Sequence, residues 1–453
     1  MNNIYHPLQP GHIRLLEKLS DHHCDLSTLH FRFQETSLQD HLYLLQPESV
    51  GIQDNETIRT ALSKAQRSPG LHKYTAISYT WGAPTKSEQI CLNGYPFMIG
   101  ANLAASLDIE RRRHDSLLSF IWADAICIHQ DDLAERNDQV SMMPLIYGLA
   151  TSVSAHIGPP ITLPSDVDAK NNITILPLIR QDYWTRTWVI QEFLLAQHLT
   201  IYSGQSSIDF KLFWAEVHKT LRLYNPYGPN PPPEPYEYSE LDRSPALSLA
   251  GARQILGDTK FDNRSLYRLL IQHSDARCTD PRDRVFAMLG LVRVEERKVL
   301  MRSFPDYSLS IQQVLVMTMA HLVEFDDSGD PAEHIFRALG RLFGKDGGEY
   351  RVTDLLPLVK IMVRMRQIGK RSRWLDERVS SSELVKALLP THAVIDLCNH
   401  PGDHIAYDSV AGFVKRTNIL KTHRWWGVTA RYLISACKSH PQKSKSAHIN
   451  WTS

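Results

Sequence analysis

The chain has 453 residues, enough for two or three domains that each bury a hydrophobic core. Hydrophobic residues make up 43% and charged residues 22%, as in ordinary globular proteins, and the formal net charge of +1 argues against a nucleic-acid partner. No apolar run is long enough to span a bilayer, and the first residues lack the pattern of a signal peptide. We expect a cytoplasmic protein with no transmembrane segment, whose six scattered cysteines stay reduced.

Residues 1–73 form a mixed preamble that is expected to pack on the domain after it. The stretches HIRLLEKL and HLYLLQPES are predicted to be strands, and residues 51–70 to be helical in part. From Tyr74 strands alternate with helices, which is typical of α/β folds with a parallel sheet. The predicted strands of this domain, residues 74–225, are YTAISYT, the almost continuously apolar SLLSFIWADAICI (116–128), TSVSAHIG and LTIYSG.

Two helices are predicted inside this domain. The first, DLAERNDQVSMMPLIYGLA, has Asp132 as its cap and Glu135 at the capping-box position, and Pro144 should kink it. The second, YWTRTWVIQEFLLAQ, is expected to be continuous. Its Trp184, Trp188 and Glu192 are each four residues apart and would then form one ridge.

The proline-rich residues 226–240 are predicted to be a linker, followed by a mainly helical region, 241–453. In CTDPRDRVFAMLGL, Asp280 is the expected helix cap and Pro281 the first helical residue. Residues 411–453 contain eight Lys or Arg and no acidic residue. Such a basic end can contact anionic lipid or an acidic partner, although a solvated tail is the commoner case. Further helices are predicted for DYSLSIQQVLVMTMAHLVE, TDLLPLVKIMVRMRQIGKRSRW and WWGVTARYLISACKS.

In an open parallel sheet, ligands bind beyond the carboxyl ends of the strands. That rule gathers Trp81 and Gly82, the loop with His129 and Gln130, and the helix with Glu192. The structural alternative is that Trp81 caps the core and Gly82 supplies a turn conformation. Asp124 lies within an apolar strand, where a buried carboxylate is costly unless it is paired. It either orients a loop or binds a hydroxyl of a ligand, or, as the favoured alternative, pairs with a buried Arg or with backbone amides.

Three other chemical interpretations carry less weight. Arg136 can meet a phosphate or pair with an acidic neighbour, and the second is favoured. Cys127 and His129 are too few for a zinc site, and a thiol in an apolar run is usually inert, so we expect no metal ion and no bound cofactor. Neither glycine-rich phosphate-binding loop pattern occurs.

Four stretches together resemble the fungal heterokaryon-incompatibility (HET) domain. They are YTAISYTWG, FIWADAICIHQDDLAERNDQVSMMPLIYGLATSVSAHIG, YWTRTWVIQE and, further downstream, DPRDRVFAMLGLV. The first three cover roughly residues 74–205, in family order. One departure is His129, where the family usually has Asn. The HET domain is in turn remotely similar to the TIR fold, so the resemblance implies a TIR/flavodoxin-like parallel sheet flanked by helices.

The resemblance also implies a function. WVIQE resembles the Trp-Val-x-x-Glu of TIR domains that cleave NAD⁺, which gives Glu192 the catalytic role and makes NAD⁺ the expected substrate. A carboxylate there would hold ribose hydroxyls and stabilise oxocarbenium-like charge. The alternative for Glu192 is a helix-surface residue paired with Arg186. The residues implied to bind substrate are Trp81, Gly82, Asp124, His129, Gln130, Arg136, Trp184 and Trp188.

The implied biological role is that of an effector of cell death and non-self recognition, part of fungal innate immunity. Self-association and a separate regulatory receptor protein are the expected interactions. Three versions of this role stay open: NAD⁺ glycohydrolysis switched on by self-association, a non-enzymatic oligomerising module that signals through partners, and a degenerate relative without activity. The His129 departure makes the third version worth keeping.

Overall fold

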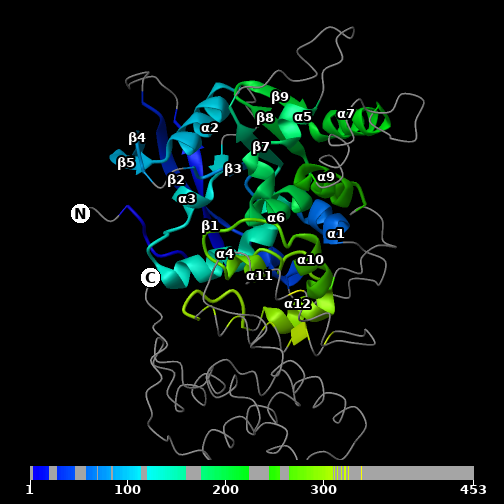
Figure 1. Cartoon of the computed structure of the whole chain (residues 1–453). Helices are drawn as coiled ribbons and strands as arrows, with labels where there is room; N and C mark the ends of the chain where they lie inside the picture. Colours follow the sequence, from blue (N-terminus) through cyan, green and yellow to red (C-terminus); the bar gives the residue numbers. More distant parts are fainter. Residues whose placement is uncertain are drawn as a thin grey trace, which may run out of the picture. The chain divides into compact units, whose positions relative to one another are not determined.

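The structure is a computed structural model. It describes residues 4–19, 28–45, 58–68, 70–82, 85–113, 120–159, 175–223, 244–255, 265–301 and 303–309, and scattered positions between 311 and 338. The chain forms two compact units (Figure 1). The first comprises Met1–Asn263 and Ala276–Lys298, and the second comprises Arg264–Asp275 and Val299–Ser453.

The first unit is built on a nine-stranded mixed sheet with the order β5-β4-β2-β1-β6-β3-β7-β8-β9. Its centre, β6-β3-β7-β8, is parallel, which agrees with the predicted parallel sheet. The outer strands include antiparallel pairs, so the sheet as a whole is not of the purely parallel kind. The strands are β1 (His12–Lys18), β2 (His30–Ser37), β3 (Tyr74–Tyr79), β4 (Glu88–Leu92), β5 (Tyr95–Ile99), β6 (Phe120–Trp122), β7 (Ser152–Gly158), β8 (Leu199–Ser203) and β9 (Ser206–Asp209).

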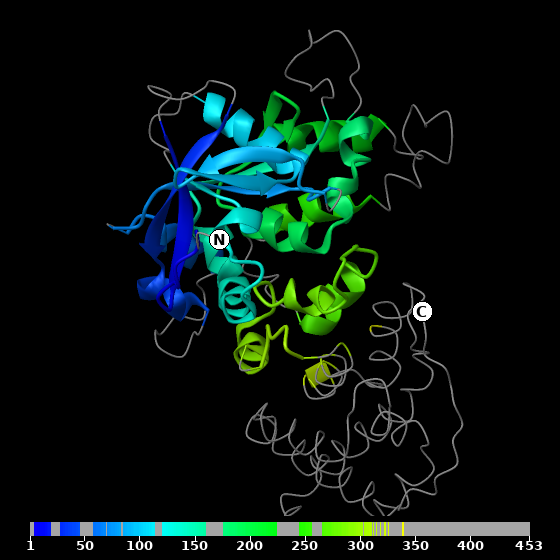
Figure 2. The same cartoon turned by 90° about the vertical axis from the view of Figure 1, so that its left-hand side faces the viewer.

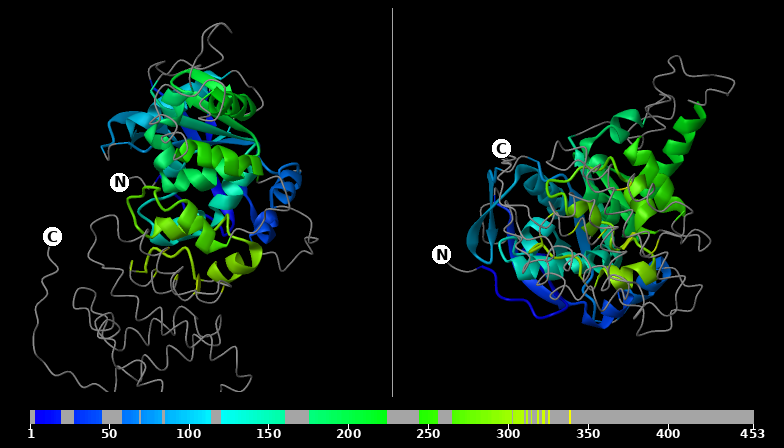
Figure 3. Two further views of the ribbon diagram at one scale, coloured as in Figure 1. Left: turned by 45° about the vertical axis from the view of Figure 1, so that its right-hand side comes forward. Right: turned by 60° about the horizontal axis from the view of Figure 1, so that its bottom comes forward.

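Helices cover both faces of this sheet (Figure 2). The β4–β5 hairpin and α7 lie at opposite ends of the first unit (Figure 3). The helices within the described residues are α1 (Ile58–Ala65), α2 (Ala101–Arg112), α3 (Asp124–Cys127), α4 (Leu133–Leu149), α5 (Leu176–Ile179), α6 (Thr187–Leu195), α7 (Phe210–Leu223), α9 (Pro245–Ile255), α10 (Leu266–Gln272), α11 (Asp283–Phe286) and α12 (Val294–Leu300), with 3-10 helices η1 (Gln39–Leu44) and η4 (Asp182–Thr185).

Strand β3 is buried along its whole length and is the centre of the core. Its side chains alternate between the two faces of the sheet, as in any strand. On one face the Tyr74 hydroxyl donates to the Ile146 carbonyl of α4 at 2.6 Å, and Ser78 contacts Glu192 of α6. Helices α4 and α6 therefore pack on this face.

The predicted strand over residues 116–128 is wrong in its second half. Strand β6 ends at Trp122, and Asp124–Cys127 form the short helix α3. The Ala123 carbonyl accepts the Cys127 amide at 2.8 Å, and the Asp124 carboxylate accepts the Ala125 amide at 2.8 Å. These local bonds turn the chain at the point where the strand would have continued.

The predicted continuous helix over residues 183–197 is also wrong. The chain forms η4, becomes extended at Arg186 and only then enters α6 at Thr187. The break has a tertiary cause, because the backbone around Arg186 pairs with Arg277 in a parallel bridge. The predicted ridge of Trp184, Trp188 and Glu192 is therefore not formed.

Other elements agree with the sequence more closely. HIRLLEK is strand β1, and β7 and β8 match their predicted stretches. Asp132 caps α4, where its carboxylate accepts the amides of Ala134 and Glu135 at 2.9 and 3.0 Å, and Pro144 lies inside this helix. HLYLL, predicted to be a strand, is the 3-10 helix η1, since i-to-i+3 bonds such as His41 to Leu38 close it.

The region after the predicted linker is described only in part. Asp280 accepts the Arg282 amide at 3.0 Å, but helix α11 begins at Asp283, later than Pro281. DYSLSIQQVLVMTMAHLVE is not helical at its start, residues 306–309, whereas its later described positions, for example Val314 and Thr318, are helical. The linker 226–240, the two later predicted helices and the basic end lie outside the described residues. Among the described helices, none is both long and apolar enough to cross a membrane.

Candidate functional site

The ends of β3 and β6 come together around Asp124. The Trp81 indole Nε1 donates to Asp124 Oδ2 at 2.9 Å, although the Trp81 residue is 45% exposed. The Gln130 side-chain amide donates to the Asp124 backbone carbonyl at 2.8 Å. Three of the residues predicted for the site therefore meet at the carboxyl edge of the parallel strands.

Gly82 has a structural reason to be glycine. Its φ is +76°, a conformation that residues with a Cβ rarely adopt. An added Cβ would also lie 2.8 Å from the Asn102 side-chain nitrogen, which donates to the Thr80 carbonyl at 2.9 Å. Asn102 thus holds the end of β3, and Gly82 lets the chain turn past it.

Glu192 is buried, contrary to the alternative that placed it on a helix surface. Only 3% of the residue is exposed, and the Ser78 hydroxyl donates to its Oε2. The Tyr183 hydroxyl lies 2.6 Å from the same Ser78 oxygen, and the Tyr147 hydroxyl is close to the carboxylate. The pKa of Glu192 is raised to about 7, mainly by burial; the Arg186 charge lowers it and the nearby Asp124 charge raises it, and both effects are included in that value.

Arg186 is the cation of this cluster. Its guanidinium donates to the Tyr79 carbonyl, and its charge lowers the pKa of both Asp124 and Glu192. The pKa of Asp124 is still raised, because burial of its carboxyl group outweighs Arg186 and the Trp81 hydrogen bond. The charge of one guanidinium therefore acts on two carboxyl groups, and we call these three residues with Trp81 the edge cluster.

Several members of this site were not predicted. Ser78 and Tyr183 support Glu192, and Arg186 was considered only as an ion-pair partner. Ser78 had a usable signal, because a hydroxyl in a strand buried on both faces needs a partner. Tyr183 and Arg186 had none, since their positions depend on the break before α6.

The two predicted tryptophans of this region lie in different environments. Trp184 is fully buried, its Nε1 donates to the Leu178 carbonyl at 2.7 Å, and its ring stacks on Phe213 with centroids 5.7 Å apart. It therefore packs in an aromatic core cluster. Trp188 is half-buried on α6.

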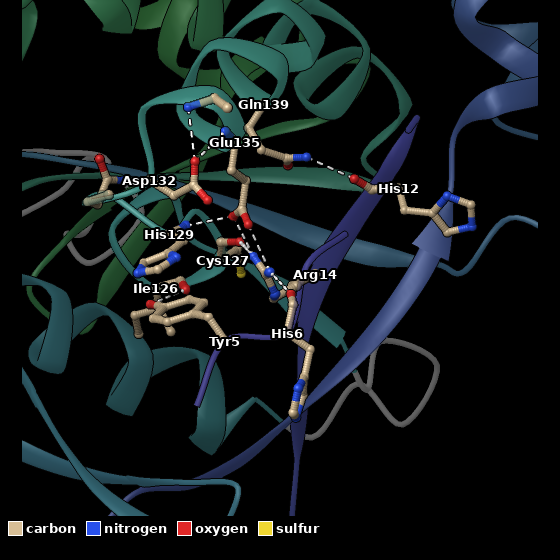
Figure 4. A network of polar contacts seen from close by, with 12 residues as sticks. Tyr5, His6, His12, Arg14, Ile126, Cys127, His129, Asp132, Glu135 and Gln139 are labelled. Carbon is tan, nitrogen blue, oxygen red and sulfur yellow. Dashed lines mark hydrogen bonds and ion pairs between the residues drawn. The ribbon is translucent and has the colours of Figure 1, made fainter. Parts of the chain in front are cut away.

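A second polar network surrounds the loop that follows α3 (Figure 4). Arg14 is buried and forms a two-pronged ion pair with Glu135, at 2.5 and 2.9 Å. Glu135 also accepts the His129 amide at 2.8 Å, so its carboxylate does not close the capping box on Asp132. The His129 ring stacks on Tyr5 with centroids 4.4 Å apart.

The remaining predicted groups have structural surroundings. Burial raises the pKa of Asp280, but its hydrogen bonds with Arg282 outweigh this, and the charge of Arg136 adds to the lowering. Asp280 is therefore an acidic neighbour of Arg136. Cys127 is fully buried, and burial raises the pKa of its thiol to about 12, so it stays protonated at neutral pH. The described residues contain no group of three or more His, Cys, Asp or Glu arranged to hold a metal ion.

Comparison with known proteins identifies part of this region. Residues 74–162 match the family model "Heterokaryon incompatibility protein (HET)". "Heterokaryon incompatibility protein 6, OR allele" of Neurospora crassa is 35% identical over 100 residues. That alignment covers 19% of this chain and only 15% of the length of the relative. No solved structure is significantly similar to the chain.

These matches support a HET domain in the part of the sheet that carries Trp81 and Asp124. Glu192 and Arg186 lie beyond the matched residues. The remote resemblance to TIR domains receives no support from the comparisons.

Proposed function

Because residues 74–162 match the HET family, we propose that this chain acts in heterokaryon incompatibility. There it would be an effector of non-self recognition and cell death in the cytoplasm. The proposal includes self-association and a separate regulatory receptor protein. The match over residues 74–162 and the Neurospora crassa relative support the incompatibility role. Only 15% of the length of the relative is matched, so the proposed activity rests on the edge cluster of this chain.

For that activity we propose cleavage of NAD⁺ to nicotinamide and ADP-ribose. The observation that carries it is that the charge of Arg186 acts on both Asp124 and Glu192, while the exposed Trp81 indole donates to Asp124. A nucleotide offers an aromatic ring, ribose hydroxyls and phosphates. An aromatic side chain, two carboxylates and a guanidinium are suitable partners for those groups.

The reaction assigns a role to each member. The bond between the ribose C1′ and the nicotinamide nitrogen breaks, and its electron pair leaves with nicotinamide. Water adds to C1′ and releases a proton. Ionised Glu192 would stabilise the positive charge that develops on the ribose, and Asp124 would hold a ribose hydroxyl. Because the pKa of Glu192 is about 7, a substantial fraction is ionised at neutral pH.

The test is NAD⁺ consumption by the purified full chain at a concentration high enough for self-association. Wild type is compared with Glu192→Gln and Asp124→Asn. Glu216→Gln on α7 is the control, because Glu216 forms an ion pair with the exposed Lys219 one turn along the same helix. We expect turnover in wild type and in the control, and loss of turnover in Glu192→Gln. Full turnover in Glu192→Gln would refute the assignment.

The second candidate is a non-enzymatic module that assembles and signals through partners. The observation that favours it is the enclosure of Glu192 by Ser78 and Tyr183, with 3% of the residue exposed. In this case an assembled wild-type protein would not consume NAD⁺, and Glu192→Gln would keep its toxicity in cells. His129→Asn, which restores the residue usual in the family, is the variant to compare next.

A further inference from the structure

The backbone of Arg277 is paired with the chain at the start of α6. The Arg277 amide donates to the Thr185 carbonyl at 2.5 Å, and its carbonyl accepts the Thr187 amide at 2.9 Å. The Thr187 hydroxyl donates to the same carbonyl at 3.1 Å. These bonds form the parallel bridge between Arg186 and Arg277, and they keep Arg186 extended while α6 begins one residue later.

A second contact holds the same helix one turn further along. The Gly290 amide donates to the side-chain oxygen of Gln191 at 3.2 Å, inside the core. A Cβ on Gly290 would lie 2.5 Å from that oxygen and 2.5 Å from Pro144 Cγ on α4. Gly290 is therefore packed tightly between α4 and α6, beside the residue that precedes Glu192.

Two buried arginines hold residues 276–298 together and connect them to the rest of the first unit. The Arg284 guanidinium donates to the Ala276 carbonyl at 3.1 Å. Arg297 donates to the Gly290 carbonyl and to the Leu44 carbonyl, both at 3.4 Å. Residues 276–298 thus form a braced segment that reaches α6 at two places.

We propose that residues 276–298 are a positioning clamp, which sets Arg186 and Glu192 in the edge cluster through Arg277 and Gly290. The clamp rests on the proposed function only for its effect on turnover, because its geometric role can be tested without a substrate. Arg277 and Gly290 are positioning residues and contact none of the reacting groups assigned above.

The clamp has a measurable consequence, because it determines how Glu192 is enclosed. A looser α6 would let water reach the Glu192 carboxyl group, so its pKa would return toward the ordinary value and the pH dependence of stability that it causes would shrink. The titratable groups that face Glu192 from the packed elements are Tyr79 on β3, Asp124 on α3, Tyr147 on α4, Tyr183 on η4 and Arg186 before α6.

The experiment compares Arg277→Pro with Arg277→Ala in the full chain. Proline removes the amide that bonds Thr185, whereas alanine keeps the backbone and loses only an exposed side chain, 3.8 Å from Asp182. We expect amide hydrogen exchange in residues 187–195 to rise about tenfold in Arg277→Pro and to stay unchanged in Arg277→Ala.

A second readout is specific to positioning. The free energy of unfolding of wild type and of each Arg277 variant is measured with and without Glu192→Gln, at about pH 5.5 and about pH 8.5, and the difference that Glu192→Gln makes is compared. We expect the change of this difference with pH to shrink in Arg277→Pro and to persist in Arg277→Ala. A purely structural segment would lower stability equally at both pH values, and that result would overturn the clamp.

Gln191→Met keeps the size of the side chain and removes the acceptor of the Gly290 amide. It is the second variant if Arg277→Pro fails to fold, and the same shrinkage is expected. Both readouts work without NAD⁺, so an inactive wild type would refute the proposed function and leave the clamp standing. Where turnover is present, kcat should fall in Gln191→Met with KM unchanged.

Discussion

The edge cluster and the Arg14–Glu135 network differ in the number of carboxyl groups for each guanidinium. Arg14 donates two hydrogen bonds to a single carboxylate, and the same two guanidinium nitrogens also donate to the backbone carbonyls of His6 and Cys127. In the edge cluster one guanidinium serves two carboxyl groups, and the pKa of each is raised. A matched pair holds two segments together, whereas an excess of buried carboxyl groups costs stability and is typical of functional sites.

The largest effect expected from this comparison is on Arg14. In Arg14→Met the Glu135 carboxylate keeps its burial and loses its cation, which costs about 3–5 kcal/mol of the free energy of unfolding. Urea denaturation measures it. Arg32→Ala is the matched control, because Arg32 forms an exposed pair with Glu17 and should cost about 0–1 kcal/mol. Equal losses in the two variants would show that the Arg14 pair is not a buried brace.

Glu192→Gln is expected to raise the free energy of unfolding, whereas Arg14→Met lowers it. The pKa of Glu192 is about 7 in the folded chain against an ordinary value of 4.5, so the folded state holds a proton that the unfolded state has released between these values. Wild-type stability therefore falls as pH rises through this window, by up to roughly 3 kcal/mol from this group. Glu192→Gln should lack this fall and be the more stable protein at about pH 8.

The measurement is the free energy of unfolding of both proteins across pH. The difference between them, rather than either curve alone, isolates Glu192 from other titrating groups. A difference that stays constant with pH would mean that Glu192 has the same pKa in the folded and unfolded states, which would contradict this prediction.

A smaller effect is expected at the turn beside the edge cluster. Gly82→Ala places a Cβ at a φ of +76° and 2.8 Å from Asn102, and should cost about 1–2 kcal/mol. The same change in an Asn102→Ala background removes the contact and leaves the backbone term. If thermal unfolding gave the same loss in both backgrounds, Asn102 would not be what fills the space beside Gly82.

The smallest effect is expected for Trp81→Phe. The change removes the hydrogen bond to Asp124 Oδ2 and keeps an aromatic ring on a residue that is 45% exposed, so it should cost about 0.5–1.5 kcal/mol. On the proposed function the same variant should lose turnover more than stability. If Trp81→Phe kept its turnover, the aromatic ring alone would be sufficient at this position, and Asp124 would have a purely structural role.

Local and nearest-neighbour signals account for what the sequence predicted well. The burial of β3, the Asp132 cap of α4 and the meeting of Trp81 with Asp124 each depend on a short pattern or on the geometry of parallel strands. The errors come from distant contacts. Nothing near Arg186 indicates that Arg277, far along the chain, will interrupt the helix, and the burial of Glu192 follows from that interruption together with Ser78.

The unit that carries the sheet is discontinuous, and this has a consequence for synthesis on the ribosome. Arg277, the backbone partner of Arg186, is made 91 residues (277 − 186) after Arg186, which takes roughly 5–18 s at about 5–20 residues per second. During that interval the emerging strands exist without the backbone partner of Arg186. The nascent chain therefore cannot hold a finished edge cluster. On the proposed function, the activity that kills the cell would be absent until most of the chain has left the exit tunnel of the ribosome.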